Sequence, residues 1–211
     1  MTKRTATPAW LGAPGAVLAI ISGPSGVGKD TIIETLRDRR TGSNYHFVVT
    51  CTTRASRPGE VDGEAYHFVS PERFTEMRER GELLEANQVH EQWYGTPREQ
   101  VGRALGAGRD IILKIDVQGA QAVKEAVPDA LLIFIVPPSM EALFQRLRSR
   151  ATETADELEL RQRNAAIELA RQGDYDHVVV NETGQVDRTA AEIEALIAQE
   201  KRRHPDRRVR V

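Results

Sequence analysis

The sequence has very little cysteine and no long apolar run. Its single cysteine, Cys51, excludes an internal disulfide and a paired-cysteine metal motif. No run approaches the roughly eighteen apolar residues that a membrane helix needs, and the first residues lack the hydrophobic centre of a secretion signal. Charge of one sign is not in excess either, because 29 basic residues stand against 31 acidic ones. The sequence therefore predicts a cytoplasmic protein with neither a membrane nor a nucleic acid as partner.

Apolar runs with the composition of buried strands alternate with segments of helical spacing. Continuous rather than alternating hydrophobicity is typical of strands covered on both faces. The predicted strands are 17–22, 111–116, 131–136 and 177–180, and the predicted helices are 29–40, 119–126, 140–149, 156–172 and 187–203. Ser139, Thr154 and Asp187 are expected to cap, or nearly cap, three of these helices. This order predicts an α/β fold with a parallel sheet flanked by helices.

Two regions depart from this alternation and divide the chain. Residues 47–96 carry short strand-like pieces around one helical stretch, which predicts an inserted α+β subdomain. The arginine-rich stretch 146–162 is expected to form a short helical lid. The predicted division is a flexible lead at 1–15, core at 16–49, a substrate subdomain at 50–97, core at 98–145, the lid at 146–162, core at 163–204 and a basic tail at 205–211 that frays.

The stretch "SGPSGVGKD" contains a phosphate-binding motif. Gly23, Gly28 and Lys29 match G-x-x-x-x-G-K, with a predicted strand before the motif and a helix after it. Glycines let backbone N–H groups approach a phosphate, and the start of the helix adds positive potential. Lys29 is expected to reach the outer phosphates of a nucleoside triphosphate. Asp30 is unusual, because this loop normally places a hydroxyl there to help hold Mg²⁺.

A second group of residues suits a phosphate monoester. Arg54 and Arg57 lie three residues apart, with Tyr66 following in the same turn-rich region. Guanidinium groups pair bidentately with phosphate oxygens, so the pattern favours an acceptor site. Taken alone, it also fits ordinary surface arginines around a Pro-Gly turn.

Four stretches together resemble the guanylate kinase family, whose members move a phosphoryl group from ATP to GMP. They are "SGPSGVGK", "TTRASRPGEVDGEAYHF", "GELLEANQVHEQWYGTP" and "ILKIDVQGA", and the resemblance runs from about residue 17 to residue 196. It implies that the GMP phosphate is held by Arg54, Arg57, Tyr66 and Tyr94. It further implies that guanine is met by Glu85, Thr50 and Thr96. A carboxylate can accept the paired N–H donors of guanine, which adenine lacks, and hydroxyls can donate to the guanine oxygen O6.

The resemblance also implies the catalytic groups and the metal. The lid arginines that would close over the phosphates are Arg146, Arg150 and Arg161, and they join Lys29 and Arg54 as catalytic residues. Mg²⁺ is expected with ATP, near Asp116 and Thr31. The predicted ATP contacts are Gly23, Pro24, Ser25, Gly26, Val27, Gly28, Lys29, Asp30, Thr31 and, beside adenine, Asn181. No general base is needed, because a phosphate acceptor is largely ionised at neutral pH.

The sequence departs from the family pattern at two positions. Asp30 replaces the usual hydroxyl, and Lys114 stands where the family usually has an acid near guanine. We predict a salt bridge between them, because each charge alone would disfavour the neighbouring phosphate or base. On this interpretation Thr31 supplies the missing hydroxyl. The alternative is that Asp30 only stabilises the helix start and Lys114 points into solvent.

Two other functions compete with GMP phosphorylation. One is a binding module that keeps the fold without catalysis, against which the intact Gly28-Lys29 pair and the acceptor stretch argue. The other is a kinase of the same superfamily that acts on a phosphorylated sugar, which would not need Glu85. The sequence predicts ATP and GMP as small-molecule substrates and a monomer or a homodimer.

Overall fold

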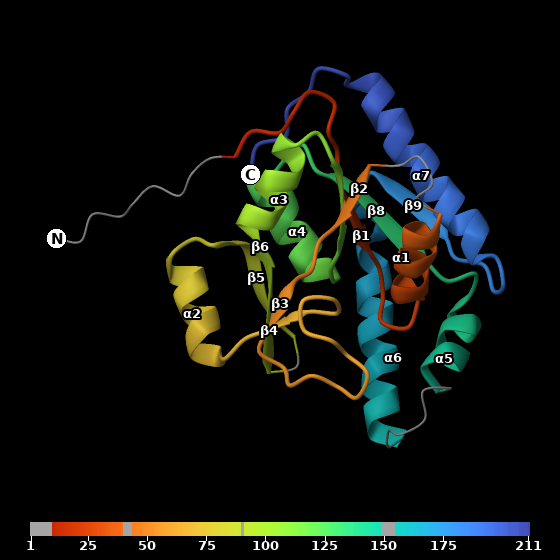
Figure 1. Cartoon of the computed structure of the whole chain (residues 1–211). Coiled ribbons are helices and arrows are strands. Elements are labelled where there is room, and N and C mark those ends of the chain that lie inside the picture. The colour runs from red at the N-terminus through yellow and green to blue at the C-terminus, as the bar shows by residue number, and fades with distance from the viewer. Residues whose placement is uncertain (1–9, 40–43, 90, 149–154) are drawn as a thin grey trace.

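The computed structural model describes residues 10–39, 44–89, 91–148 and 155–211, and its centre is a parallel sheet (Figure 1). The strand order is β2-β7-β1-β8-β9, with β1 paired in parallel to both β7 and β8. The bounds are β1 Leu18–Ser22, β2 Tyr45–Phe47, β7 Asp110–Lys114, β8 Leu131–Val136 and β9 His177–Val180. The predicted fold class, a parallel sheet flanked by helices, is confirmed.

Helices cover both faces of this sheet (Figure 1). Alternate residues of β1 enter opposite cores: Ile21 packs with helices α1, α5 and α7, whereas Ile20 packs with α3 and α4. The helices are α1 Lys29–Asp38, α3 Arg98–Gly106, α4 Val117–Ala126, α5 Met140–Arg148, α6 Ala155–Leu169, the 3₁₀ helix Ala170–Asp174 and α7 Val186–Arg203. Burial on both faces explains why the strands read as continuous apolar runs.

A second, smaller sheet lies to one side of the first, with helix α2 beyond it (Figure 1). Its order is β4-β3-β6-β5, and β6 is antiparallel to both of its neighbours. The bounds are β3 Cys51–Thr52, β4 His67–Phe68, α2 Pro71–Glu79, β5 Leu83–Val89 and β6 Gln92–Pro97. Phe74 and Met77 of α2 pack on Cys51 and Leu83 in a core of their own. The strands of this second sheet carry Glu85, Tyr94 and Thr96, and the loops beside them carry the other predicted acceptor residues.

The prediction of a frayed tail is wrong. Val209 and Val211 are buried in the core, and the tail pairs with the segment that follows residue 9. The prediction of a flexible lead at 1–15 is therefore also wrong for residues 10–15. The N–H groups of Trp10 and Gly12 donate to the carbonyls of Val211 and Val209, at 3.0 and 2.8 Å. The apolar residues that alternate with arginine in "RRVRV" explain the pairing, because one face of an extended segment can be buried while the other stays in water.

The helices and strands differ from the prediction at α3 and at the end of β7. Helix α3 was not expected, because its sequence is short and contains two glycines. Strand β7 ends at Lys114, and Asp116 instead caps α4 by accepting the Gly119 N–H. The Ser139 hydroxyl accepts the Ala142 N–H at 3.1 Å, which confirms that cap, while Thr154 lies outside the described residues. Within the described part of the chain, no helix is long and apolar enough to cross a membrane.

Candidate active site

The phosphate loop connects the carboxyl end of β1 to the start of α1, where parallel α/β sheets place their ligands. Gly23 and Gly28 have φ angles of 145° and 100°, which side chains rarely allow. A Cβ at Gly23 would lie 2.4 Å from the Ile135 carbonyl oxygen, and one at Gly28 would lie 2.7 Å from Asn181 Nδ2. Both glycines are therefore required by conformation and by space.

Lys29 is folded onto the loop that precedes it. Its Nζ donates to the carbonyl oxygens of Gly23 at 2.6 Å and Pro24 at 3.0 Å. Burial lowers the pKa of Lys29 to about 8, and the carboxylates of Glu168 and Asp30 oppose that shift. The ammonium is thus held beside the loop, ready to exchange carbonyl partners for phosphate oxygens.

Two of the predicted lid arginines contact the phosphate loop region. Arg146 of α5 donates to the carbonyls of Val27 and Asn181, each at 3.1 Å, and Arg161 of α6 donates to Ser25 Oγ at 3.2 Å. Arg150 lies outside the described residues. Helices that follow β8 therefore bring positive charge to the loop from far along the chain.

Asn181 is a buried brace for the loop. Its Nδ2 donates to the Val27 carbonyl at 2.8 Å, and its Oδ1 accepts the Thr189 hydroxyl at 3.3 Å. The side-chain amide therefore has a structural task in this structure. Its predicted place beside adenine stays a prediction.

The predicted acceptor residues gather on the second sheet and its loops. The Arg54 guanidinium forms two 2.9 Å bonds to the carboxylate of Glu60 and lies 5.4 Å from the Tyr66 ring centre. The Tyr66 and Tyr94 rings are 5.9 Å apart. Arg57 is exposed, and only its backbone N–H contacts Glu60, at 2.7 Å. The structure thus brings a cation and two phenols together, with a second guanidinium at the rim.

Glu85 is a buried carboxylate on β5, only 7% exposed, with a hydrogen bond to each oxygen. Thr96 Oγ1 donates to Oε1 and Asn87 Nδ2 donates to Oε2, each at 2.7 Å. Burial raises the pKa of Glu85, while these two bonds lower it. The Thr96 hydroxyl hydrogen expected on guanine O6 points to the carboxylate instead. Thr50 is half-buried on the loop before β3.

Asp116 and Thr31, the residues predicted near Mg²⁺, flank the phosphate loop at the starts of α4 and α1. Asp116 Oδ1 accepts the Gly119 N–H at 2.8 Å. Burial raises the pKa of Asp116, opposed by that bond and by the charge of Lys29. No group of three or more acidic, histidine or cysteine side chains is placed to hold a metal ion within the described residues.

The predicted contact between Asp30 and Lys114 is confirmed. Lys114 Nζ lies 2.5 Å from Asp30 Oδ1. The two residues come from α1 and from the end of β7, and β7 lies beside β1 with Lys114 opposite Ile21. The pairing of neighbouring strands thus brings together two side chains that are far apart in sequence.

Three contacts made by other residues were missed from the sequence. Glu60 lies inside the "RPGE" stretch of the family resemblance, and Asn87 follows Glu85 on the same face of a strand. The sequence pattern could therefore have indicated both residues. No sequence pattern indicated Glu168. Its Oε2 accepts the Ser25 N–H of the phosphate loop at 3.0 Å, and only the packing of α6 reveals it.

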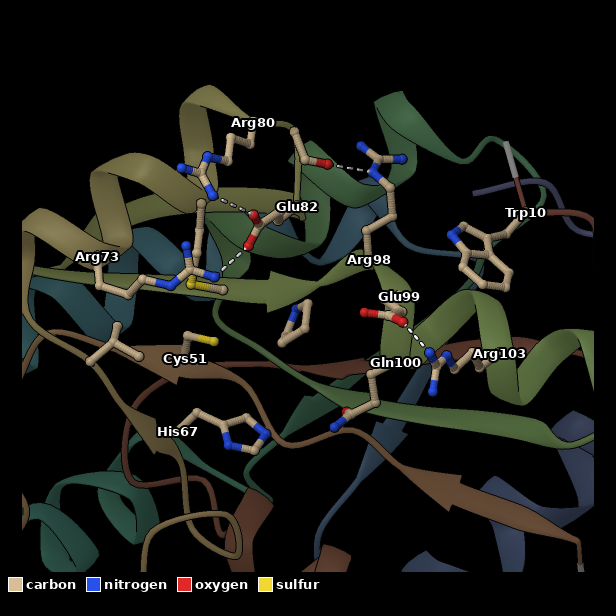
Figure 2. Close-up of a pocket in the computed structure, with 14 residues that line it drawn as sticks. Trp10, Cys51, His67, Arg73, Arg80, Glu82, Arg98, Glu99, Gln100 and Arg103 are labelled. Carbon is tan, nitrogen blue, oxygen red and sulfur yellow. Dashed lines mark hydrogen bonds and ion pairs between the residues drawn. The ribbon is translucent and has the colours of Figure 1, made fainter. Parts of the chain in front are cut away.

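A cavity of about 1010 Å³ lies elsewhere, against α2 and the start of α3 (Figure 2). None of the predicted site residues lines it. Arg73 and Arg80 pair with Glu82, and Arg103 pairs with Glu99. Arg98 donates to two backbone carbonyls. Because these guanidinium groups are already engaged, cavity size does not indicate the site here, and the side-chain chemistry around the phosphate loop does.

Comparisons with known proteins point in one direction. The family model described as guanylate kinase matches residues 16–200. The chain is 44% identical over 199 residues to guanylate kinase 2, chloroplastic/mitochondrial, of Oryza sativa subsp. japonica, covering 94% of this chain and 69% of that protein. It is 44% identical over 200 residues to the guanylate kinase of Mycobacterium bovis, covering 93% and 92%. The crystal structure of guanylate kinase from Anaplasma phagocytophilum superposes with a TM-score of 0.71 at 32% identity, covering 90% of this chain and 88% of that one.

Proposed function

Because the chain belongs to the guanylate kinase family, we propose that it transfers the γ-phosphoryl group of ATP to GMP, giving ADP and GDP. The observation that carries this proposal is Glu85, a buried carboxylate whose two oxygens are oriented by Thr96 and Asn87. Glu85 lies within electrostatic reach of Asp116, which in turn lies within reach of Lys29. This chain of neighbours is consistent with one site that takes guanine at Glu85 and the donor phosphates at the phosphate loop.

Recognition of guanine would use acceptor oxygens already held in place. The N1–H and N2–H₂ donors of guanine lie along one edge, and a carboxylate presents acceptors only. Holding both oxygens in advance reduces the entropy lost when the base binds. Adenine offers the carboxylate no such pair of donors, which disfavours AMP.

The chemistry would be an in-line displacement at phosphorus. An ionised oxygen of the GMP phosphate attacks the γ-phosphorus as the bond to the ADP oxygen breaks, so no proton has to move. Lys29 and Arg54 would offset charge on the donor and acceptor sides. Positioning and charge neutralisation would then account for the rate. None of the residues proposed for this site is a histidine, which agrees with a reaction that needs no general base.

Mg²⁺ is proposed to bind with ATP. Oxygen donors suit it, and it is commonly held by one or two protein oxygens together with substrate phosphates. Asp116, across from Lys29, and Thr31, in the first turn of α1, are the oxygen donors proposed to hold it. Bound there, the ion would neutralise charge on the phosphate oxygens.

We also propose that the substrates draw the lid and the acceptor subdomain together. Arg146 and Arg161 already contact the phosphate loop, whereas Arg54 and Tyr66 lie on the segment between β3 and β4 of the second sheet. ATP and GMP together should therefore protect residues 146–161 and 47–96 from proteolysis more than either does alone. Protection by ATP to which GMP adds nothing would contradict this two-part closure.

The decisive experiment measures ADP formation from Mg-ATP with GMP, AMP or ribose 5-phosphate as acceptor. We expect turnover with GMP and little with the others. Glu85→Gln should lower kcat/KM for GMP by about 100-fold or more, because the amide presents an N–H to a guanine donor. Glu82→Gln is the matched control, because Glu82 lies three residues away and lines the Figure 2 cavity. It should leave kcat/KM for GMP unchanged.

Each alternative has its own result in this assay. Preference for ribose 5-phosphate would favour the sugar-phosphate kinase, and absence of transfer to any acceptor would favour a binding module. Sedimentation of the purified chain tests the proposed monomer or homodimer. The proposed cytoplasmic location rests on the single cysteine.

A further inference from the structure

Lys114 occupies a position between the two predicted phosphate sites. It ends β7, the strand beside β1, so its side chain starts at the same edge of the sheet as the phosphate loop. Its Nζ contacts Asp30 in the first turn of α1, on the donor side. The same Nζ lies 5.9 Å from the ring centre of Tyr66, on the acceptor side. One ammonium therefore contacts the donor side and lies close to an aromatic ring of the acceptor side.

The acceptor side of Lys114 is the part predicted to hold the GMP phosphate. The Tyr66 ring next to it also lies 5.4 Å from the Arg54 guanidinium and 5.9 Å from the Tyr94 ring. On the donor side, Lys114, Asp30 and Lys29 lie close enough for their charges to affect one another. The Lys114 ammonium therefore lies beside one element of the predicted donor side, Asp30, and one of the predicted acceptor side, Tyr66.

The ammonium has hydrogen-bonding capacity to spare. It carries three N–H donors, and within the described residues it makes one hydrogen bond, to Asp30. Its side chain is 30% exposed and that of Asp30 is 64% exposed. An ion pair this open to water contributes little to folding stability. In this structure the contact directs the Lys114 ammonium toward the first turn of α1, beside the phosphate loop.

We propose that Lys114 is a further catalytic residue, whose ammonium donates to the phosphoryl group in transfer, and that Asp30 is the residue that positions it. This inference rests on the proposed GMP phosphorylation. The bond from the γ-phosphorus to the ADP oxygen breaks, the bond to the GMP phosphate oxygen forms, and Lys114 keeps its protons throughout. The ammonium stabilises charge on the equatorial oxygens of the moving group, which is greatest in the transition state.

The test compares Lys114→Met with the wild-type chain in two measurements. Loss of one preorganised donor should lower kcat by about 100-fold and leave KM for ATP and GMP within about threefold. A bisubstrate analogue, adenosine and guanosine joined by five phosphates, spans both sites and is measured by calorimetry without turnover. Its affinity should fall by about 30-fold in Lys114→Met, whereas ATP and GMP alone bind within about threefold of normal.

Two further variants separate catalysis from a structural role. Lys124→Met is the matched control, because Lys124 forms a similarly exposed pair with Asp176, 3.2 Å away, outside the crevice. It should leave kcat within about twofold. Asp30→Asn should cost about tenfold in kcat alone and add less than about twofold to Lys114→Met, because Asp30 acts through Lys114.

The outcomes distinguish this inference from the proposed function. Normal GMP phosphorylation by the wild-type chain, with kcat of Lys114→Met within about threefold of it, overturns the role of Lys114 alone. Losses that multiply fully in the double variant overturn the positioning by Asp30. A wild-type chain that does not phosphorylate GMP overturns the proposed function and this role with it.

Discussion

The donor and acceptor sides of the crevice are built in different ways. The donor side is one continuous stretch, in which backbone curvature and Lys29, bonded to carbonyls five and six residues earlier, form the phosphate site. The acceptor side is assembled from side chains, with Arg54 held by Glu60 and Glu85 held by Thr96. Every nucleoside triphosphate offers the same phosphates, so backbone groups suffice for them. Selecting one monophosphate requires side chains matched to its base.

We expect the largest loss of activity when the donor-side cation, Lys29, is removed. Lys29→Ala should lower kcat by about 1,000-fold or more, because this ammonium contacts the group that moves. GMP affinity, measured by calorimetry, should change by less than about threefold, since the acceptor side is built from other residues. Near-normal kcat in this variant would contradict the assignment of the loop.

The acceptor side predicts a different pattern of loss, in binding. Arg57→Ala should weaken GMP by about 10- to 100-fold, and Tyr66→Phe by about tenfold, because each removes a hydrogen bond to a charged group. Guanosine, which lacks the phosphate, should bind within about twofold of normal. Arg80→Ala, in the Figure 2 cavity, is the control. Equal losses for GMP and guanosine would contradict the assignment of Arg57 and Tyr66.

The buried lysine makes the donor side sensitive to mildly alkaline pH. Lys29 is charged below its pKa of about 8 and loses its proton above it. The ratio kcat/KM for ATP, which reports the free enzyme, should therefore fall as pH rises through 8, approaching about tenfold per pH unit. Lys29→Arg stays charged and should remove the decline. A wild-type profile that stays flat to about pH 9.5 would show that Lys29 does not titrate in this window.

The smallest expected effect concerns the carboxylate that sits on the loop. Glu168 accepts the Ser25 N–H, a donor that a phosphate could use, so Glu168→Gln should tighten ATP by about threefold to tenfold at pH 7. Glu168 also raises the pKa of Lys29, so the gain should shrink above pH 8. Glu159→Gln is the control, because it breaks a pair with Arg163 and leaves the loop untouched. It should change neither the ATP affinity nor the pH dependence of that affinity. Weaker ATP binding at pH 7 in Glu168→Gln would show that this carboxylate helps the substrate.

Local patterns carried most of what the sequence predicted correctly. Gly23, Gly28 and Lys29 could be identified because the loop they form needs particular φ angles and short-range contacts. Four of the five strands of the central sheet were found because burial on both faces leaves continuous apolar runs, whereas the three-residue strand β2 was missed. Helix α3 was missed since its glycines and short length hide a stripe that is buried only by tertiary packing.

The sequence by itself determined the phosphate loop and the parallel sheet, and it led to the proposed acceptor residues for GMP. Apart from the contact between Asp30 and Lys114, only the tertiary structure decided which distant groups meet. It placed Glu168 on the Ser25 N–H and buried Val209 and Val211 against the segment after residue 9. The physical reason is the distance along the chain over which each kind of interaction acts. Backbone conformation and hydrophobic period act over a few residues, whereas a hydrogen bond between residues 25 and 168 depends on how whole helices pack.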